Sequence, residues 1–268
     1  MTILQAIILG LVEGITEFLP ISSTGHLILT QSLLGLHGPA IEALLIFIQG
    51  PAILAVCWEF RKKLLGVAFS LHRDPAARRF VINLLIVFLP VAVLALLFGD
   101  AIKAVLFKPV PVAIALVVGG VIILWAERRK HSERVQDVDQ LTAVDALKLG
   151  AFQALALIPG TSRSGATIIG GLLCGLSRRT AAEFSFFVAI PVLLAATAYE
   201  LYKERAAIAQ FEHAPLIVSC VVSFLSALLA VKFLIRFVSR HSFAAFGWYR
   251  IVFGALILIT AATGVVRW

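Results

Sequence analysis

Residues 80–98 read FVINLLIVFLPVAVLALLF, an uncharged run close to the roughly 20 residues that one helical crossing of a bilayer needs. The chain of 268 residues shares this character, with 60% hydrophobic residues, 14% charged residues and a mean hydropathy of +1.00. Soluble domains carry roughly 25% charged residues. The composition therefore excludes a soluble enzyme, a disordered chain and a nucleic-acid-binding protein, and it predicts a polytopic protein of the lipid bilayer.

Six apolar runs predict membrane-spanning helices: 43–58, 80–98, 109–126, 184–199, 214–231 and 251–266. Four further apolar pieces are too short or too interrupted to cross: 3–19, 24–36, 146–158 and 165–177. The polar segments PISSTGH at 20–26 and PGTSRSG at 159–165 divide them into two pairs. Non-helical backbone at membrane depth must be covered by protein or line a cavity. We therefore expect an all-α integral membrane protein with six transmembrane helices and two re-entrant helix hairpins.

The basic residues indicate the orientation of the chain. Lys and Arg are concentrated in segments 61–79, 127–140 and 236–240, whereas 99–108 and 203–213 hold two each. Because cytoplasmic loops carry the excess of positive charge, we expect the first three segments in the cytoplasm. With six crossings, both termini then lie outside.

The two halves of the sequence match at a constant offset of 140 residues. Leu9-Gly10 falls on Leu149-Gly150, and the other matched pairs include Ser22 with Ser162, Gly25 with Gly165 and Pro51 with Pro191. The expected topology of the second half is inverted, a pattern typical of transporters whose sites lie between the repeats. We expect one membrane domain, 1–268, in which repeats of about 1–125 and 141–268 are joined by a basic cytoplasmic loop and their polar tips meet.

Glu13 and Glu17 are one helical turn apart and therefore lie on one face of the first helix. Two carboxylates within a membrane repel each other, so a cation between them is favoured. Oxygen ligands suit a divalent cation, Mg²⁺ or Ca²⁺. The alternative is that one of the two is protonated and hydrogen-bonded to a neighbouring helix.

The run Ser22-Ser23-Thr24-Gly25-His26 offers hydroxyls and an imidazole within five residues. These side chains supply a candidate nucleophile and a candidate acid or base. The same run is also typical of a helix start, which is itself a site for anions. Both interpretations can hold together.

Arg163 lies in the turn between two glycines, where its planar guanidinium matches a phosphate group. Backbone amides and hydroxyls around it would complete a phosphate cradle formed by Gly160, Thr161, Ser162, Ser164, Gly165 and Thr167. The alternative is an ion pair from Arg163 to Glu13 or Glu17 that closes the hairpins together. Charged residues near the ends of apolar runs are expected to snorkel to the interface: Glu59, Lys148, Lys232 and Arg250.

The segments EGITEFLPISSTGH at 13–26 and PGTSRSGAT at 159–167 resemble the undecaprenyl-diphosphatase, or bacitracin-resistance, family. The resemblance implies a membrane phosphatase of the bacterial inner membrane that releases phosphate from undecaprenyl diphosphate. This reaction recycles the lipid carrier for peptidoglycan synthesis and confers bacitracin resistance. It also implies a site that faces the periplasmic or outer side of the membrane and depends on a divalent cation, in an all-helical fold of six crossings and two re-entrant hairpins in inverted repeats.

Carried over by motif, Glu13 and Glu17 match the acidic pair, and Ser23 and His26 match the residues that attack phosphorus or act as acid or base. The resemblance leaves open which of these two is the nucleophile. Arg163, with Ser162 and Thr167, matches the phosphate-binding group. We also expect Ser22, Thr24 and the rest of the cradle to bind substrate.

The sequence departs from the family after the first hairpin, where Leu45 stands at a position that is usually acidic. Glu42, one turn earlier on the same helix face, is expected to substitute for it. A transporter or flippase for a polyprenyl phosphate lipid is the alternative function, because inverted repeats are typical of transporters. The paired carboxylates, hydroxyls and arginine suit phosphoryl transfer better than passage alone. The sequence leaves both a monomer and a homodimer open.

Overall fold

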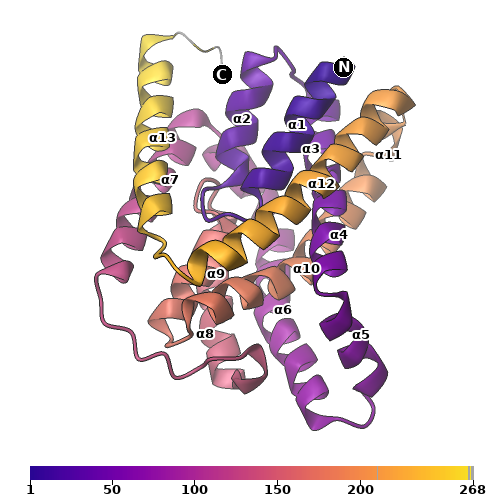
Figure 1. Ribbon diagram of the computed structural model, residues 1–268. Coiled ribbons are helices and arrows are strands. Elements are labelled where there is room, and N and C mark those ends of the chain that lie inside the picture. Colours follow the sequence, from indigo (N-terminus) through magenta and orange to yellow (C-terminus); the bar gives the residue numbers. More distant parts are fainter. Residues whose placement is uncertain (210, 265, 267–268) are drawn as a thin grey trace.

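We describe the protein from a computed structural model, which covers residues 1–209, 211–264 and 266 (Figure 1). Apart from an isolated bridge between Val135 and Leu176, all regular structure in these residues is helical. The helices are α1 (Ile3–Thr16), α2 (Ser23–Leu33), α3 (Pro39–Phe47), α4 (Gln49–Glu59), α5 (Arg61–Ser70), α6 (Pro75–Leu106), α7 (Pro109–Glu127), η1 (Val138–Gln140), α8 (Ala143–Ala154), η2 (Leu155–Leu157), α9 (Arg163–Leu173), α10 (Arg178–Lys203), α11 (Arg205–Ile208), α12 (His213–Val238) and α13 (Ala244–Thr263).

Within the described residues, six helical segments are long and apolar enough to cross a membrane: Pro39–Glu59, Pro75–Ile102, Pro109–Glu127, Arg178–Lys203, His213–Val238 and Ala244–Thr263. The first of them combines α3 and α4, and the others belong to α6, α7, α10, α12 and α13. Each overlaps one of the six predicted runs, which confirms the all-helical, six-span prediction. The chain is a multi-pass membrane protein.

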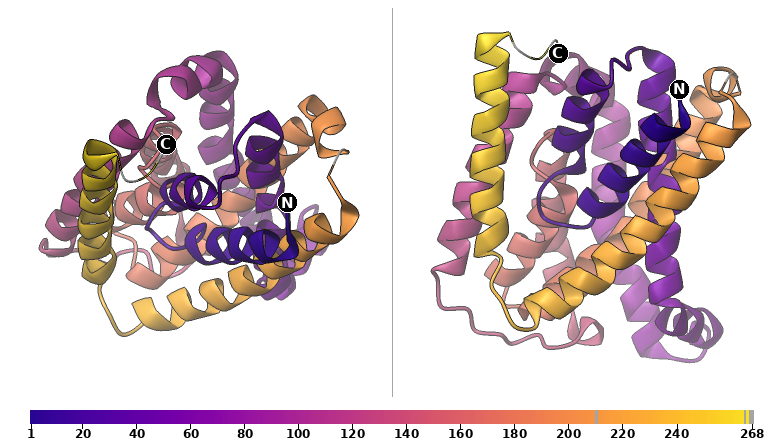
Figure 2. Two further views of the ribbon diagram at one scale, coloured as in Figure 1. Left: turned by 90° about the horizontal axis from the view of Figure 1, so that it is seen from above. Right: turned by 45° about the horizontal axis from the view of Figure 1, so that its top comes forward.

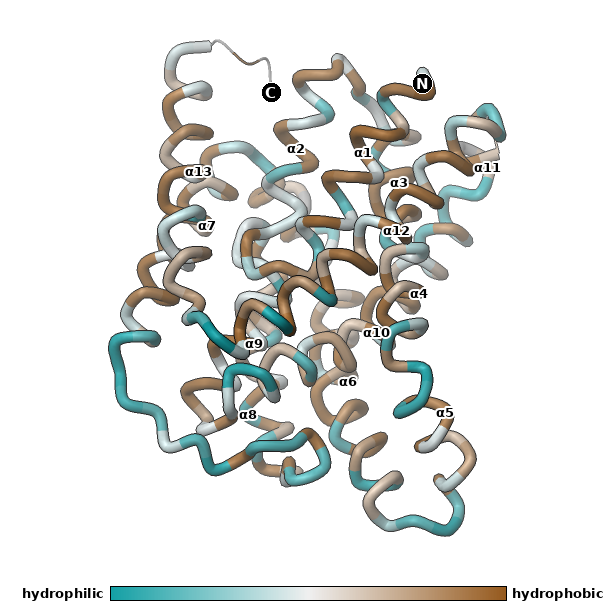
Figure 3. Tube along the Cα trace, viewed as in Figure 1, coloured by the Kyte–Doolittle hydropathy of each residue, from teal (hydrophilic) through white to brown (hydrophobic). Residues whose placement is uncertain are grey.

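Large apolar side chains cover the outside of these helices. Leu96, Leu97 and Leu229 are 72%, 69% and 70% exposed, respectively. In water such a surface would be unfavourable, whereas in a bilayer it meets lipid. The hydrophilic stretches gather mainly in the connections, as the tube in Figure 3 shows.

Two pairs of short helices lie among the long ones. The first pair, α1 and α2, has 14 and 11 residues, and the second, α8 and α9, has 12 and 11. At 1.5 Å per residue even α1 is only about 21 Å long, less than the hydrocarbon core of about 30 Å. Helix α1 packs along α12, and α8 packs along α6. The segments that connect the two members of each pair come together in the interior of the molecule (Figure 2).

The short helices have recognisable caps at the start of α1 and at the ends of α2 and α9. Thr2 forms a capping box with Gln5 at the start of α1. Helix α2 ends shortly before Gly35, which has a φ of 65°, and α9 ends shortly before Gly175, which has a φ of 85°. A glycine in this left-handed region ends a helix without a steric penalty for Cβ.

The connections divide between the two ends of the molecule as the charges predict. Helix α5, the α7–α8 connection and the α12–α13 turn lie at one end, and the N-terminus, the α2–α3 turn and the α6–α7 turn lie at the other (Figure 2, right). The expected loops at 61–79 and 99–108 are wrong in detail, because α5 occupies much of the first and α6 extends through most of the second. A helix continues past the membrane surface where its backbone hydrogen bonds can still form within the chain.

Candidate active site

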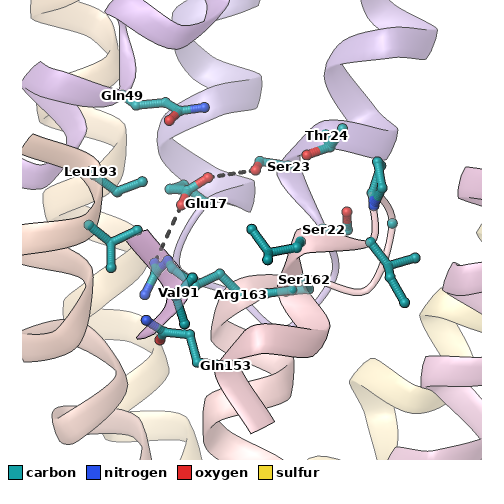
Figure 4. Close-up of a pocket in the computed structure, with 16 residues that line it drawn as sticks. Glu17, Ser22, Ser23, Thr24, Gln49, Val91, Gln153, Ser162, Arg163 and Leu193 are labelled. Carbon is teal, nitrogen blue, oxygen red and sulfur yellow. Dashed lines mark hydrogen bonds and ion pairs between the residues drawn. The ribbon is translucent and has the colours of Figure 1, made fainter. Parts of the chain in front are cut away.

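A cavity of about 180 Å³ lies where the α1–α2 and α8–α9 connections meet (Figure 4). Seven of the predicted site residues line it: Glu17, Ser22, Ser23, Thr24, Gly160, Ser162 and Arg163. Side chains from α4, α6, α8 and α10 complete the wall, among them Gln49, Val91, Gln153, Val192 and Leu193. Residues 146 positions apart in sequence, Glu17 and Arg163, therefore face the same small space.

Glu17 is at the centre of the polar contacts in this cavity. It caps the C-terminus of α1 and is only 8% exposed. Ser23 Oγ donates to Glu17 Oε2 at 2.5 Å, and Arg163 Nη2 approaches Glu17 Oε1 at 3.4 Å (Figure 4). The second contact is one of the two ion pairs that the sequence allowed for Arg163. A buried carboxylate that accepts from a serine hydroxyl can take up its proton.

Arg163 begins α9 and retains unused hydrogen-bonding capacity. Its Nη1 donates to the carbonyl of Ser185 on α10 at 3.0 Å. Its Nε is buried and has no hydrogen-bond partner among the described residues. A guanidinium held on one side, with a free N–H on the other, can receive an anion.

The α1–α2 connection (17–22) and the α8–α9 connection (158–162) are the two polar tips of the helix pairs, and they share an unusual backbone conformation. Ser22 and Ser162, the residues before α2 and α9, have φ values of 70° and 71°, and no other non-glycine residue in the described part of the chain has a positive φ. Such conformations are unfavourable for residues with a Cβ and concentrate at functional sites. Both residues directly precede a helix, and the N-terminus of a helix, where the helix dipole is positive, favours an anion.

One serine hydroxyl joins the two tips, and a second one makes hydrogen bonds at the start of α9. Ser164 Oγ donates to the carbonyl of Leu19 at 2.8 Å, which joins α9 to the α1–α2 connection. Ser162 Oγ accepts from the amide of Gly165 at 3.1 Å and lies 3.0 Å from Ser164 Oγ. Ser164 and Gly165 therefore shape the tip from behind the cavity wall.

Gln153 lines the cavity but belongs to neither of the two sequence motifs. Its Oε1 lies 3.1 Å from Thr167 Oγ1, whose one proton is shared with the carbonyl of Arg163 at 2.9 Å, so the amide nitrogen is the donor that is left over. This nitrogen is buried and has no partner among the described residues. The offset of 140 residues pairs Gln153 with Glu13, and this correspondence was the signal that could have identified it.

Glu13 lies one turn before Glu17 and is fully buried, but it does not line the cavity. Neither of its carboxylate oxygens has a hydrogen-bond partner among the described residues. An orphaned buried carboxylate requires either a cation or a proton. Hard oxygen ligands of this kind suit Mg²⁺ or Ca²⁺.

His26 does not reach the cavity. Its Nδ1 donates to the carbonyl of Ser22 at 2.7 Å, and its Nε2 lies 2.7 Å from the hydroxyl of Tyr249. The ring stacks on Phe253 at a centroid distance of 4.0 Å. Because a carbonyl only accepts, Nδ1 is the donor in the first of these hydrogen bonds, and the Tyr249 hydroxyl engages Nε2. The imidazole thus fastens α2 to α13.

Two expectations for charged residues are wrong. Arg250 does not snorkel, because it is 1% exposed and its guanidinium binds backbone carbonyls inside the protein. Glu42 does not substitute for a buried acid, because its side chain is exposed. Leu45, in contrast, packs with Leu9 and Leu44 in a small apolar cluster.

The fold and the site define a multi-pass helical membrane protein whose buried polar tips bring a carboxylate, a serine and an arginine together. Residues 6–256 match the family described as bacitracin resistance protein BacA, and the chain belongs to this family. It is 61% identical to undecaprenyl-diphosphatase 2 of Rhodospirillum rubrum over 267 residues, which cover 99% of this chain and 97% of the relative. It is also 57% identical to the undecaprenyl-diphosphatase of Dechloromonas aromatica, with the same coverage of both chains.

Proposed function

We propose that this protein hydrolyses undecaprenyl diphosphate to undecaprenyl phosphate and inorganic phosphate. The reaction would recycle the lipid carrier for peptidoglycan synthesis and confer bacitracin resistance. Relatives that bear the name of this enzyme over 99% of the chain support the proposal. The observation that carries the chemistry is the 2.5 Å hydrogen bond from Ser23 Oγ to Glu17 Oε2 inside the cavity.

In the proposed mechanism Ser23 is the nucleophile and Glu17 is its base. Ser23 Oγ forms a bond to the terminal phosphorus while its proton passes to Glu17. The bond from that phosphorus to the bridging oxygen breaks, and its electron pair leaves with undecaprenyl phosphate. Water then attacks the phosphoserine, Ser23 regains a proton, and inorganic phosphate departs. The engagement of both His26 nitrogens outside the cavity supports Ser23 over His26 as the nucleophile.

The diphosphate is proposed to bind at the second tip. The free Nε of Arg163, at the start of α9, and the free amide nitrogen of Gln153, on α8, are buried donors of residues that line the same cavity. The first turns of α2 and α9 add backbone N–H groups. The predicted cradle completes the site with Gly160, Thr161, Ser162, Ser164, Gly165 and Thr167, and the first tip contributes Ser22 and Thr24.

A divalent cation, Mg²⁺ or Ca²⁺, is proposed to bind between Glu13 and Glu17. The two orphaned oxygens of Glu13 and the hard character of both carboxylates fit such an ion. When bound, it would offset the negative charge of the diphosphate. Glu13, which is buried behind the residues that line the cavity, would be one of the ligands of this cation.

We propose that His26 serves the reaction by positioning rather than by direct attack. Its hydrogen bond to the Ser22 carbonyl fixes the residue just before the nucleophile. Its second contact, to Tyr249, connects this segment to α13.

The proposed topology has α1–α2 and α8–α9 as re-entrant hairpins in two inverted repeats, 1–125 and 141–268. Several features support it: the short helices, the shared φ of Ser22 and Ser162, and the gathering of basic loops at one end. By the positive-inside rule that end faces the cytoplasm. The family resemblance supports a site open to the periplasmic side of the bacterial inner membrane.

The test is phosphate release from undecaprenyl diphosphate by the purified protein in detergent, with and without a chelator. Glu17→Gln is expected to lower kcat by about 100-fold or more, as for the loss of a general base. Glu42→Gln is the matched control, because it changes an exposed carboxylate to the same amide. Well-folded wild-type protein that releases no phosphate with Mg²⁺ or Ca²⁺ present would refute the proposal and favour the transporter.

A further inference from the structure

Arg250 has the largest fully buried side chain in the described part of the protein. It lies on α13, within a helix long and apolar enough to cross the membrane. A buried guanidinium is costly unless its donors are satisfied. Its partners therefore indicate what it does.

All five N–H groups of Arg250 are used, and every acceptor is a main-chain carbonyl. No carboxylate forms an ion pair with Arg250 in the ranges that the structure covers. The acceptors and their distances are Thr161 at 2.9 Å, Gly160 at 2.9 Å, Pro20 at 3.3 Å, Ala115 at 3.3 Å and Leu116 at 3.3 Å.

These carbonyls belong to three separate parts of the chain. Pro20 lies in the α1–α2 connection, Gly160 and Thr161 lie in the α8–α9 connection, and the other two acceptors lie on α7. A single side chain from α13 therefore fastens both polar tips to the α7–α13 pair. The planar fork of arginine can hold several acceptors in fixed directions, which an ammonium group cannot do.

We propose that Arg250 is a positioning residue that sets the relative placement of the two tips. Pro20 stands midway between Glu17 and Ser23, and Gly160 and Thr161 directly precede Ser162 and Arg163. Arg250 acts on these groups through the backbone and does not touch the substrate. The proposal rests on the proposed function, because it concerns the same reaction.

Gly119 offers a way to disturb the guanidinium without changing residue 250. A Cβ at Gly119 would overlap Arg250 Nη2 and lie 2.8 Å from its Cζ. Gly119→Ala must therefore displace the guanidinium from its carbonyls. Gly99→Ala is the matched control, because a Cβ there meets nothing within 4 Å on a helix of similar character.

The experiment compares Arg250→Lys, Arg250→Gln, Gly119→Ala and Gly99→Ala in the full-length protein in detergent. It measures kcat and KM for undecaprenyl diphosphate, amide hydrogen exchange of segments 17–23 and 159–165, and the melting temperature. We expect both Arg250 variants and Gly119→Ala to speed exchange in both segments and to lower kcat by about 100-fold, the effect of a displacement of about 1 Å. KM should change much less than kcat, and Gly99→Ala should match the wild type.

Two outcomes would overturn the proposal. Arg250→Lys with wild-type kcat would show that only the charge matters, because lysine keeps the charge but has three donors. Variants with a lower melting temperature but normal kcat per folded molecule, and normal exchange of the two segments, would show a purely structural role. The exchange measurement needs no turnover. If the wild-type protein released no phosphate, the proposed function would be refuted, and faster exchange in the variants would still support the positioning role of Arg250.

Discussion

Replacing Arg163 by alanine tests the phosphate site most directly. The structure leaves its Nε buried without a partner, and its Nη2 is only 3.4 Å from Glu17. These two N–H groups can turn to a phosphate. Hydrogen bonds to charged groups contribute about 1.5–3 kcal/mol each, so their loss costs about 3–6 kcal/mol. At about 1.4 kcal/mol per tenfold change, kcat/KM should fall by about 10²–10⁴.

The assay is steady-state phosphate release with undecaprenyl diphosphate, corrected for the folded fraction. Arg179→Ala is the control, because Arg179 is 65% exposed and forms a surface pair with Glu183. Exposed pairs contribute little, so this variant should keep wild-type kcat/KM. An Arg163→Ala enzyme with kcat/KM within about threefold of wild type, a difference below 1 kcal/mol, would refute the assignment of Arg163 to the substrate.

Three further predictions concern other parts of the molecule. Gln153→Leu should raise KM for the diphosphate about tenfold, because it removes one buried donor, and steady-state kinetics measure this change. Gly14→Ala should lower the melting temperature in detergent, because its Cβ would overlap α12, whereas Gly66→Ala fills open space and should not. Burial opposes ionisation of Asp145, yet hydrogen bonds from Arg134 and Thr142 hold its pKa below the usual 3.8. The resulting stability is present above pH 3.8 and is lost as the pH falls through the lower pKa of the folded protein, and unfolding curves of Asp145→Asn should lack this acid-sensitive part.

The sequence predicted the parts of the fold that depend on local length and composition. Six spans follow from the apolar runs, because a bilayer imposes one length on every crossing. The contact between the two tips also followed, since PISSTGH and PGTSRSG occupy equivalent places in the two halves. In the structure, the ion pair between Arg163 and Glu17 is part of that contact.

The directions of individual side chains could not be predicted in the same way. Arg250 stands near the end of an apolar run, where a local pattern indicates snorkelling. Its burial depends on carbonyls from α7 and two distant connections, which no local pattern contains. His26 likewise belongs to the predicted motif, but a hydroxyl on α13, 223 positions away, turns its ring from the cavity. Packing between distant segments, rather than the motif, decides both orientations.

The positive φ values of Ser22 and Ser162 also bear on how the protein can change under selection. A left-handed residue with a Cβ is less stable than glycine by about 1–2 kcal/mol. A search for heat-resistant variants would therefore favour glycine at both positions, at the expense of two hydroxyls in the cavity wall. Thermostability and turnover would compete at these two serines, and the natural sequence retains the less stable backbone at both.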